Sequence, residues 1–216
     1  MHPAKAFHVD DRDALLAFVR EHSFVTLAAA VGGLPFVAQA PVVVRELDFG
    51  EVALDFHLSR ANALAPHLVQ GFRAVALATG PHAYVSPDWY GTDDQVPTWN
   101  YVSAEAEGLV APLSADETLV LLDDLSAQEE GRLSPKKPWT RDKMTPARFE
   151  GLIRGIVGCR LTIERLEGTF KLGQNKSAAE RAGVIAALGD DRWRSGCVSP
   201  DASPAGARCP TARRSG

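Results

Sequence analysis

The feature that most constrains the fold is a pair of apolar, strand-like runs joined by Gly32-Gly33. The runs are SFVTLAAAV before the glycines and LPFVAQAPVVV after them. A glycine pair in this position predicts a β-hairpin, because glycine readily adopts the positive φ of tight hairpin turns. Pro35 and Pro41 lack the N–H that a ladder needs, so the second strand is expected at a sheet edge, at a bulge or with a late start.

Further strand signals recur along the chain. EVALDFHL alternates apolar residues with small or charged ones and predicts a half-buried antiparallel strand. RAVALATGPHAYVS and TWNYVSAEAEGLVAPL follow, and VGCRLTIERLEGTFKL predicts one long strand or two strands with a break near Gly168. Helical patterns begin at Asp10 or Asp11, at Ser114, at Pro146 and near Ser177. The tally predicts a mainly β fold with peripheral helices (α+β), an antiparallel β-barrel rather than a parallel sheet.

Composition limits the classes of function. The net charge of −4 and the scattered basic residues argue against non-specific nucleic-acid binding. No apolar run reaches the roughly 20 residues that span a bilayer, and the N-terminus lacks a secretory pattern, so a cytoplasmic location is expected. The three cysteines have no metal-ligand spacing, and Cys159 is expected as a small buried hydrophobe. We expect one domain over residues 1–188 and disorder over 189–216, where Gly, Pro, Ser and Arg dominate and aliphatic residues are rare.

The stretch from Gly80 to Gly108 holds all three tyrosines and two of the four tryptophans of the chain. Its turn residues predict a strand, a long loop, and a second strand entered through Val96-Pro97. Amphipathic rings gathered in this way suit a planar ligand or a subunit interface. Composition alone leaves equally open an ordinary aromatic cluster that packs under the loop.

Two polar constellations could bind a ligand. Ser59, Arg60 and Asn62 follow a predicted strand, and Ser59 is a candidate cap for a short helix. A hydroxyl, a guanidinium and backbone N–H groups at a helix N-terminus would suit a phosphate dianion. The alternative is a capped surface helix with a solvated arginine.

The second constellation spans residues 171–176, KLGQNK, in which two lysines flank a Gln-Asn pair after a glycine bend. Amides can pair with ring carbonyls and nitrogens, and lysines supply point charge to a phosphate. The alternative is a polar loop before the last helix. The histidines have no Ser, Asp or Cys partner at catalytic spacing, and Glu105 and Glu107 fit a solvated strand face better than an acid–base pair, so the catalytic residues stay unknown and no metal site is predicted.

Three segments together resemble the PaiB-type FMN-binding negative transcriptional regulators. They are HLSRAN, AYVSPDWYG with VPTWNYVSAEAEG, and GIVGCRLTIERLEGTFKLGQNK. The resemblance covers roughly residues 1–188 and implies an antiparallel split β-barrel that forms a homodimer with FMN near the subunit interface. It implies a cofactor site that includes the residues matching the three segments: Ser59, Arg60, Asn62, Trp99, Asn100, Tyr101, Lys171, Gln174, Asn175 and Lys176.

Within that implied site, Arg60 and a lysine would hold the FMN phosphate, and Trp99 and Tyr101 would wall the ring system or the dimer contact. Two departures matter. Gly173 stands where the family usually has Ser, and Thr169-Phe170 where it has Lys-Trp. The loss of a hydroxyl and a cation could weaken phosphate binding.

Three functions stay open. The first is a negative transcriptional regulator that senses flavin redox state or a metabolite. DNA is a partner by resemblance, but no helix-turn-helix or basic recognition helix supports direct binding. The second is an FMN-dependent oxidoreductase acting on a small substrate at the dimer interface, with the flavin supplying the redox chemistry. The third is a dimeric barrel that has lost FMN.

Overall fold

The structure is a computed structural model, and it describes residues 3–189. The predicted disorder after residue 189, together with Cys197 and Cys209, lies outside the described residues. Cys159 is fully buried, as predicted, and burial raises the pKa of its thiol to about 12. Within residues 3–189, no helix has the length and apolar character needed to cross a membrane.

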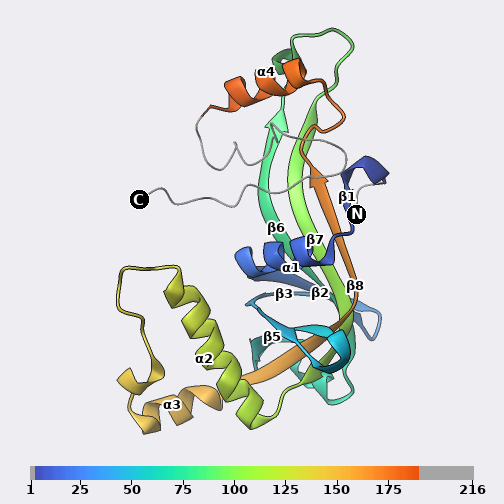
Figure 1. The fold of residues 1–216 in the computed structure, drawn as a ribbon. Coiled ribbons are helices and arrows are strands. Elements are labelled where there is room, and N and C mark those ends of the chain that lie inside the picture. The colour runs from blue at the N-terminus through green and yellow to red at the C-terminus, as the bar shows by residue number, and fades with distance from the viewer. Residues whose placement is uncertain (1–2, 190–216) are drawn as a thin grey trace. The chain divides into compact units, whose positions relative to one another are not determined.

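Eight strands form one sheet, accompanied by four α-helices in the described residues (Figure 1). The strands are β1 (His8–Val9), β2 (Phe24–Val31), β3 (Leu34–Pro41), β4 (Val43–Glu46), β5 (Val52–Ser59), β6 (Phe72–Val85), β7 (Thr98–Pro112) and β8 (Ile156–Lys171). The helices are α1 (Arg12–Glu21), α2 (Ala115–Gly131), α3 (Pro146–Ile153) and α4 (Ala178–Leu188). The sheet order is β3-β2-β6-β7-β8-β5-β4, with β1 paired to β8. This antiparallel α+β architecture confirms the predicted fold class.

The chain divides into two compact units, which are described separately. The α4 unit comprises Met1–Leu15, Thr79–Ala104 and Glu167–Gly216, and the α2 unit comprises Leu16–Ala78 and Glu105–Leu166. Strands β6, β7 and β8 each contribute one segment to both units. The expectation of a single domain over residues 1–188 stays a prediction.

The glycine-pair hairpin forms as predicted in the α2 unit. Val31 of β2 pairs with Leu34 of β3, which leaves Gly32 and Gly33 as a two-residue turn with φ of 59° and 80°. Positive φ at both turn positions matches the twist of the flanking strands and favours glycine. Strand β3 lies at one end of the sheet order, so the edge position is the correct one of the three explanations for its prolines.

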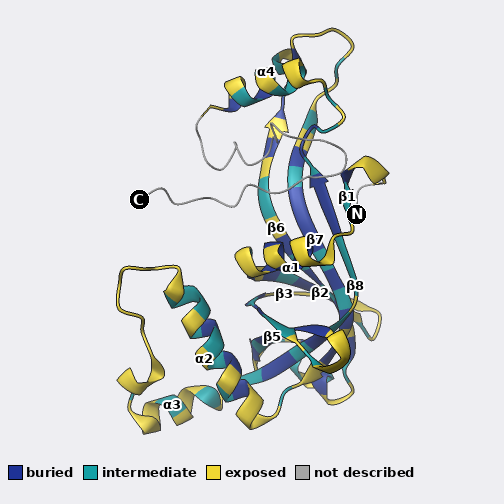
Figure 2. Ribbon diagram, in the orientation of Figure 1, coloured by how far each residue is buried: buried dark blue, intermediate teal, exposed yellow. Residues whose placement is uncertain are grey.

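Strand β5 differs from its prediction because it is buried on both faces. Ala53 and Asp55, expected on a solvent face, are 0% and 1% exposed. The strand lies between β4 and β8, and helix α2 packs against it, so both sets of alternating side chains are covered (Figure 2). The buried Asp55 carboxylate therefore requires partners within the protein.

Helix α2 begins at the predicted capping box of Ser114 and Glu117.

In the α4 unit, helix α4 packs on the aromatic loop. Its predicted cap, Ser177, forms a capping box with Glu180. The buried face of α4 contacts the start of the loop in a cluster of Ala83, Val85, Tyr90, Val184 and Leu188. A Cβ on Gly183 would lie 2.2 Å from the Trp89 carbonyl oxygen, so only glycine permits this approach of helix and loop.

Strand β8 is one uninterrupted strand, which decides between the two alternatives left open at Gly168. A Cβ at Gly168 would lie 2.3 Å from Leu15 Cδ2 of helix α1, so the glycine serves close packing rather than a break.

Candidate functional site

The segment after β5 is a turn, and no helix begins at Ser59. Ser59 still pairs with Ile156 in the β5–β8 ladder, and the next helical element is a 3₁₀ segment over Ala65–Val69. The Ser59 hydroxyl accepts a hydrogen bond from Ala61 N at 3.2 Å, and Asn62 Oδ1 accepts one from Leu64 N at 2.9 Å. The prediction of a helix N-terminus at Ser59 is therefore wrong, because its hydroxyl closes a turn over residues 60–64 and the helical residues begin only at Ala65.

Arg60 is the one charged residue of this motif, and its side chain is exposed. Its Nε donates to the Arg154 carbonyl at 3.1 Å while its backbone N donates to the Gly155 carbonyl at 2.9 Å. It is the only charged residue along a hollow of about 350 Å³ that Pro66 and Val157 also line. A guanidinium fixed through Nε keeps its Nη groups available for an anion.

Gln174 has a structural role in the turn after β8. Its Oε1 accepts from Leu172 N at 2.8 Å, and its Nε2 donates to the Phe170 and Ala6 carbonyls at 2.6 and 3.1 Å. The adjacent Gly173 has a φ of 75°, in the left-handed region that favours glycine. The glycine in place of the family serine therefore has a backbone reason.

Lys176 joins the aromatic loop to the beginning of α4. Its Nζ donates to Gln95 Oε1 and lies 4.5 Å from the centroid of the Tyr90 ring. Gln95 Nε2 in turn donates to Glu180 Oε1 at 3.0 Å, and Thr92 Oγ1 donates to the same oxygen at 3.1 Å. Lys176 is thus engaged by the protein itself, whereas the neighbouring Asn175 is exposed.

Lys171 is a half-buried cation whose polar contact is a hydroxyl. Its Nζ donates to Thr98 Oγ1 and lies 5.8 Å from the centroid of the Phe7 ring. Among residues 3–189 no carboxylate pairs with it, and burial lowers the pKa of its ammonium group. The adjacent Thr169 and Phe170 are each 2% exposed. A lysine and a hydroxyl without a neutralising carboxylate are the donor set that fits a phosphate.

The aromatic stretch separates into a packed part and an open part. Tyr90 belongs to the cluster under α4, where Trp89 packs against it. Trp99 is 56% exposed, and its ring centroid lies 6.1 Å from that of Tyr84 and 6.2 Å from that of His82. Packing under α4 therefore explains Tyr90 and Trp89, whereas the ligand or interface explanation stays a prediction for the exposed rings.

Alternation along β7 divides the three residues of the central motif. Trp99 and the half-buried Tyr101 share one face of the strand, and Asn100 points to the other face. Asn100 is 3% exposed, and a Cβ on Gly173 would lie 3.8 Å from its Nδ2. Asn100 thus belongs to the interior beside the β8 turn.

The predicted site residues divide between the two units. The α4 unit contains Trp99, Asn100, Tyr101, Lys171, Gln174, Asn175 and Lys176, and the α2 unit contains Ser59, Arg60 and Asn62. None of the three predicted cations, Arg60, Lys171 and Lys176, forms an ion pair with a carboxylate inside the described residues, but Lys176 is held by Gln95 and Tyr90. No group of three or more His, Cys, Asp or Glu residues within residues 3–189 could hold a metal ion.

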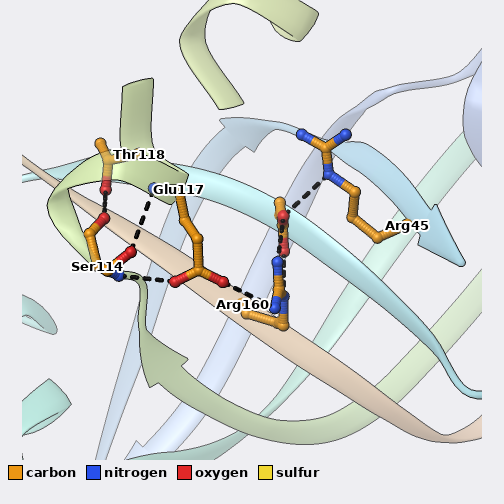
Figure 3. A network of polar contacts seen from close by, with 6 residues as sticks. Arg45, Ser114, Glu117, Thr118 and Arg160 are labelled. Carbon is orange, nitrogen blue, oxygen red and sulfur yellow. Dashed lines mark hydrogen bonds and ion pairs between the residues drawn. The ribbon is translucent and has the colours of Figure 1, made fainter. Parts of the chain in front are cut away.

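Sequence reasoning could not place Asp55, which is buried and accepts hydrogen bonds from Arg45 and Arg160, two of the residues labelled in Figure 3. Arg160 donates from Nε and Nη2 to the two Asp55 oxygens at 2.8 and 2.9 Å, and Arg45 Nε donates to Oδ2 at 3.0 Å. These bonds to Asp55 raise the pKa of Arg160.

Arg160 Nη1 also donates to Glu117 at 3.2 Å. The Ser114 N–H, together with Arg160, lowers the pKa of Glu117. A charged residue between Leu54 and Phe56 was the available signal, but its partners depend on strand register.

Comparison with known proteins gives the family. The family described as "Putative FMN-binding domain" matches residues 1–165. The chain belongs to this family. It is 28% identical over 188 residues to "Protease synthase and sporulation protein PAI 2" of Bacillus subtilis, which covers 87% of this chain and 89% of the relative. It is also 31% identical over 201 residues to an uncharacterized protein of Emericella nidulans, covering 77% of this chain and 78% of that one.

Solved structures agree on the fold. The FAD and heme binding protein from Mycobacterium smegmatis has a TM-score of 0.56 at 19% identity, covering 84% of this chain and 80% of its own. The flavocytochrome Anf3 from Azotobacter vinelandii has a TM-score of 0.52 at 16% identity, covering 80% and 73%. At these identities the likeness extends to the fold alone, and the fold is the split-barrel type expected of the FMN-binding family.

Proposed function

We propose that this protein binds FMN, with Lys171 as the first candidate for the phosphate-binding cation and Arg60 as a separate, alternative candidate, because the two adjoin opposite ends of strand β8. The observation that carries the proposal is the Lys171 ammonium group, which is partly desolvated beside the Thr98 hydroxyl without a carboxylate partner in the described residues. Holding such a cation away from water has a cost that a bound anion would offset. Membership of the FMN-binding family supports the identity of that anion.

The open aromatic rings give the flavin a candidate wall. Trp99 exposes more than half of its surface next to Tyr84 and His82, and Tyr101 lies on the same face of β7. Exposed aromatic rings favour stacking with a planar heterocycle. Bound FMN would supply electron and hydride transfer, while the residues of the chain would bind and orient it.

The visible absorbance spectrum of the purified protein tests this proposal. We expect a flavin band after incubation with FMN and gel filtration, and we expect Lys171→Met to weaken it, while Arg60→Ala tests the alternative candidate separately. A protein that is colourless and takes up no added FMN would overturn the proposal.

We further propose a regulatory role that works through sensing of flavin or a metabolite, as the PaiB-type resemblance implies. The basic cluster between Arg132 and Lys143 does not present a free cationic face, because acidic residues of helix α2 form ion pairs with two of its cations. Lys136 pairs with Glu130, and Arg141 with Asp123 at 3.2 Å. A gel-shift assay that found tight, sequence-specific and FMN-independent DNA binding would contradict this mode of action.

An FMN-dependent oxidoreductase is the second candidate function. It is favoured by the exposure of Tyr84 and Trp99, 46% and 56%, which leaves ring surface for a small substrate. Oxidation of NADH or NADPH by the FMN-loaded protein, stimulated by a substrate from a broad panel, would support it. No flavin reduction with any compound of the panel would contradict it.

A homodimer is the proposed assembly. Phe24 and Val37 are 64% and 70% exposed, and they lie on one face of the β2–β3 hairpin because Val37 pairs with Ala28, four residues after Phe24. An exposed apolar sheet face of this kind is typical of a subunit interface. Light scattering should give the mass of a dimer, and Val37→Glu should give a monomer. A monomeric parent protein would contradict the proposal.

A further inference from the structure

The α2 unit contains a cavity of about 430 Å³ that none of the ten implied cofactor residues lines. Helices α2 and α3, the segment between them and the end of β5 form its walls. Most of the lining residues are apolar, and they include Trp139, Met144, Phe149 and Ile153. This volume is within the range of small-molecule sites, which are apolar with a few polar groups that orient the ligand.

The charged groups at the cavity wall are already paired. Arg141 forms an ion pair with Asp123 at 3.2 Å, and Glu129 accepts from Ser23 Oγ at 2.8 Å and from Gln128 Nε2 at 3.0 Å. A charged ligand would lose its hydration here without a free counter-ion. The cavity therefore selects for an uncharged molecule.

His57 is the exception among the polar lining groups. Its Nδ1 is buried and has no hydrogen-bond partner within residues 3–189. Burial lowers the pKa of the imidazole, so the ring is neutral near pH 7, with one nitrogen that donates and one that accepts. Because Nδ1 has no accessible surface, a ligand hydroxyl would meet the ring at its other nitrogen, Nε2, which is not among the fully buried atoms. A hydroxyl can donate to or accept from Nε2, whichever tautomer the ring adopts.

We propose that this cavity is a binding site for an uncharged, planar aromatic molecule with a hydroxyl group that hydrogen-bonds to His57. Trp139 and Phe149 provide ring surface, and Met144 provides an adaptable side chain against it. The proposal uses none of the ten residues of the implied cofactor site, although His57 is the first residue of the HLSRAN segment.

The same segments connect the cavity with the Arg60 turn. His57 lies three residues before Arg60, and Ile153 and Ile156 of the cavity wall flank Arg154 and Gly155, whose carbonyls accept from Arg60. A molecule in the cavity and the Arg60 side chain would thus both contact the segment over residues 153–156.

Equilibrium dialysis with 2-naphthol and with naphthalene tests the proposal, because the two probes share a shape and differ by the hydroxyl. We expect saturable binding of 2-naphthol at one site per chain. His57→Phe keeps the ring volume and removes both nitrogens, so it should weaken 2-naphthol binding about fivefold and leave naphthalene binding unchanged. Equal losses for both probes, or no loss for 2-naphthol, would overturn the role of His57.

A matched pair of variants on α2 tests the cavity itself and does not depend on whether His57→Phe folds. Leu122→Trp fills the cavity and should abolish 2-naphthol binding. Val120→Trp adds the same ring at a position that is 54% exposed and outside the cavity wall, and it should leave binding intact. Circular dichroism confirms that both variants are folded. Undiminished binding by folded Leu122→Trp, or no saturable binding by the parent protein, would overturn the site.

Discussion

Asp55 and Lys171 show two different fates of a buried charge. Asp55 is 1% exposed and is held by two arginines with three hydrogen bonds, all supplied by strands β4 and β8. Lys171 is half-buried and has a hydroxyl and a ring as neighbours, with no carboxylate in the described residues. We infer that the neutralised Asp55 stabilises the fold, and we propose the unneutralised Lys171 as a ligand-binding residue.

The largest expected effect is the loss of Asp55. Asp55→Ala leaves Arg45 and Arg160 partly buried without their counter-ion, so we expect it to lower the free energy of unfolding by about 3–5 kcal/mol. Asp124→Ala is the control, because Asp124 also pairs with Arg45 but is 42% exposed, and its loss should cost about 1 kcal/mol or less. Urea unfolding followed by circular dichroism measures both. A similar, small loss in the two variants would show that Asp55 is not a structural charge.

Lys171→Met should show the opposite pattern. Removing the cation should weaken FMN binding about tenfold or more, since charge-assisted hydrogen bonds are among the strong ones. The free energy of unfolding should change by less than about 0.5 kcal/mol, because the desolvation of the ammonium group disappears together with its bond to Thr98. Flavin fluorescence and urea unfolding measure the two effects. A large loss of stability with unchanged FMN affinity would make Lys171 a structural residue.

Lys176→Met should give a smaller effect, of the structural kind. It removes the bond to Gln95 and the cation–π contact with Tyr90, which together should contribute about 0.5–1 kcal/mol to stability. We expect faster proteolysis within the loop from Ser86 to Pro97, and a loss of FMN affinity smaller than that of Lys171→Met. If Lys176→Met weakened FMN binding as much as Lys171→Met, both lysines would belong to the cofactor site.

The smallest effect concerns pH. The pKa of Glu117 is lowered in the folded protein, so its stabilisation is complete above the unfolded pKa and is lost as pH falls through the folded pKa. Glu117→Gln should therefore cost about 0.5 kcal/mol at pH 7, a modest value because the carboxylate is largely exposed. The difference between the two proteins should vanish toward about pH 3. A constant difference from pH 7 to pH 3 would mean that the charge of Glu117 contributes nothing.

The sequence predicted those elements whose signals are local. The Gly32-Gly33 hairpin and the capping boxes at Ser114 and Ser177 formed as expected, because turn and cap chemistry involves residues a few positions apart. The helix expected from Ser59 did not form. Ser59 pairs with Ile156 in a distant strand, and its hydroxyl closes a turn before the helical residues that begin at Ala65.

The site was predictable only as a set of motifs. The local sequence marks Gln174, Lys176 and Lys171 equally as candidate cofactor residues. In the structure, however, Gln174 bonds within the turn after β8, and Lys176 bonds to Gln95. The partners of Asp55 and the cavity beside His57 depend on register and on the packing of α2 and α3, which no short pattern encodes.

The most direct test of the account compares FMN with riboflavin, which differ by the phosphate alone. Titration followed by flavin fluorescence should show FMN binding at least about tenfold tighter than riboflavin. The phosphate would form a charge-assisted hydrogen bond to Lys171 or Arg60, neither of which pairs with a carboxylate in the described residues. Combining Arg60→Ala with Lys171→Met should remove that preference while the protein stays folded. Equal affinity of the parent protein for the two flavins, or an unchanged preference in the double variant, would contradict the assignment of these cations to the cofactor phosphate.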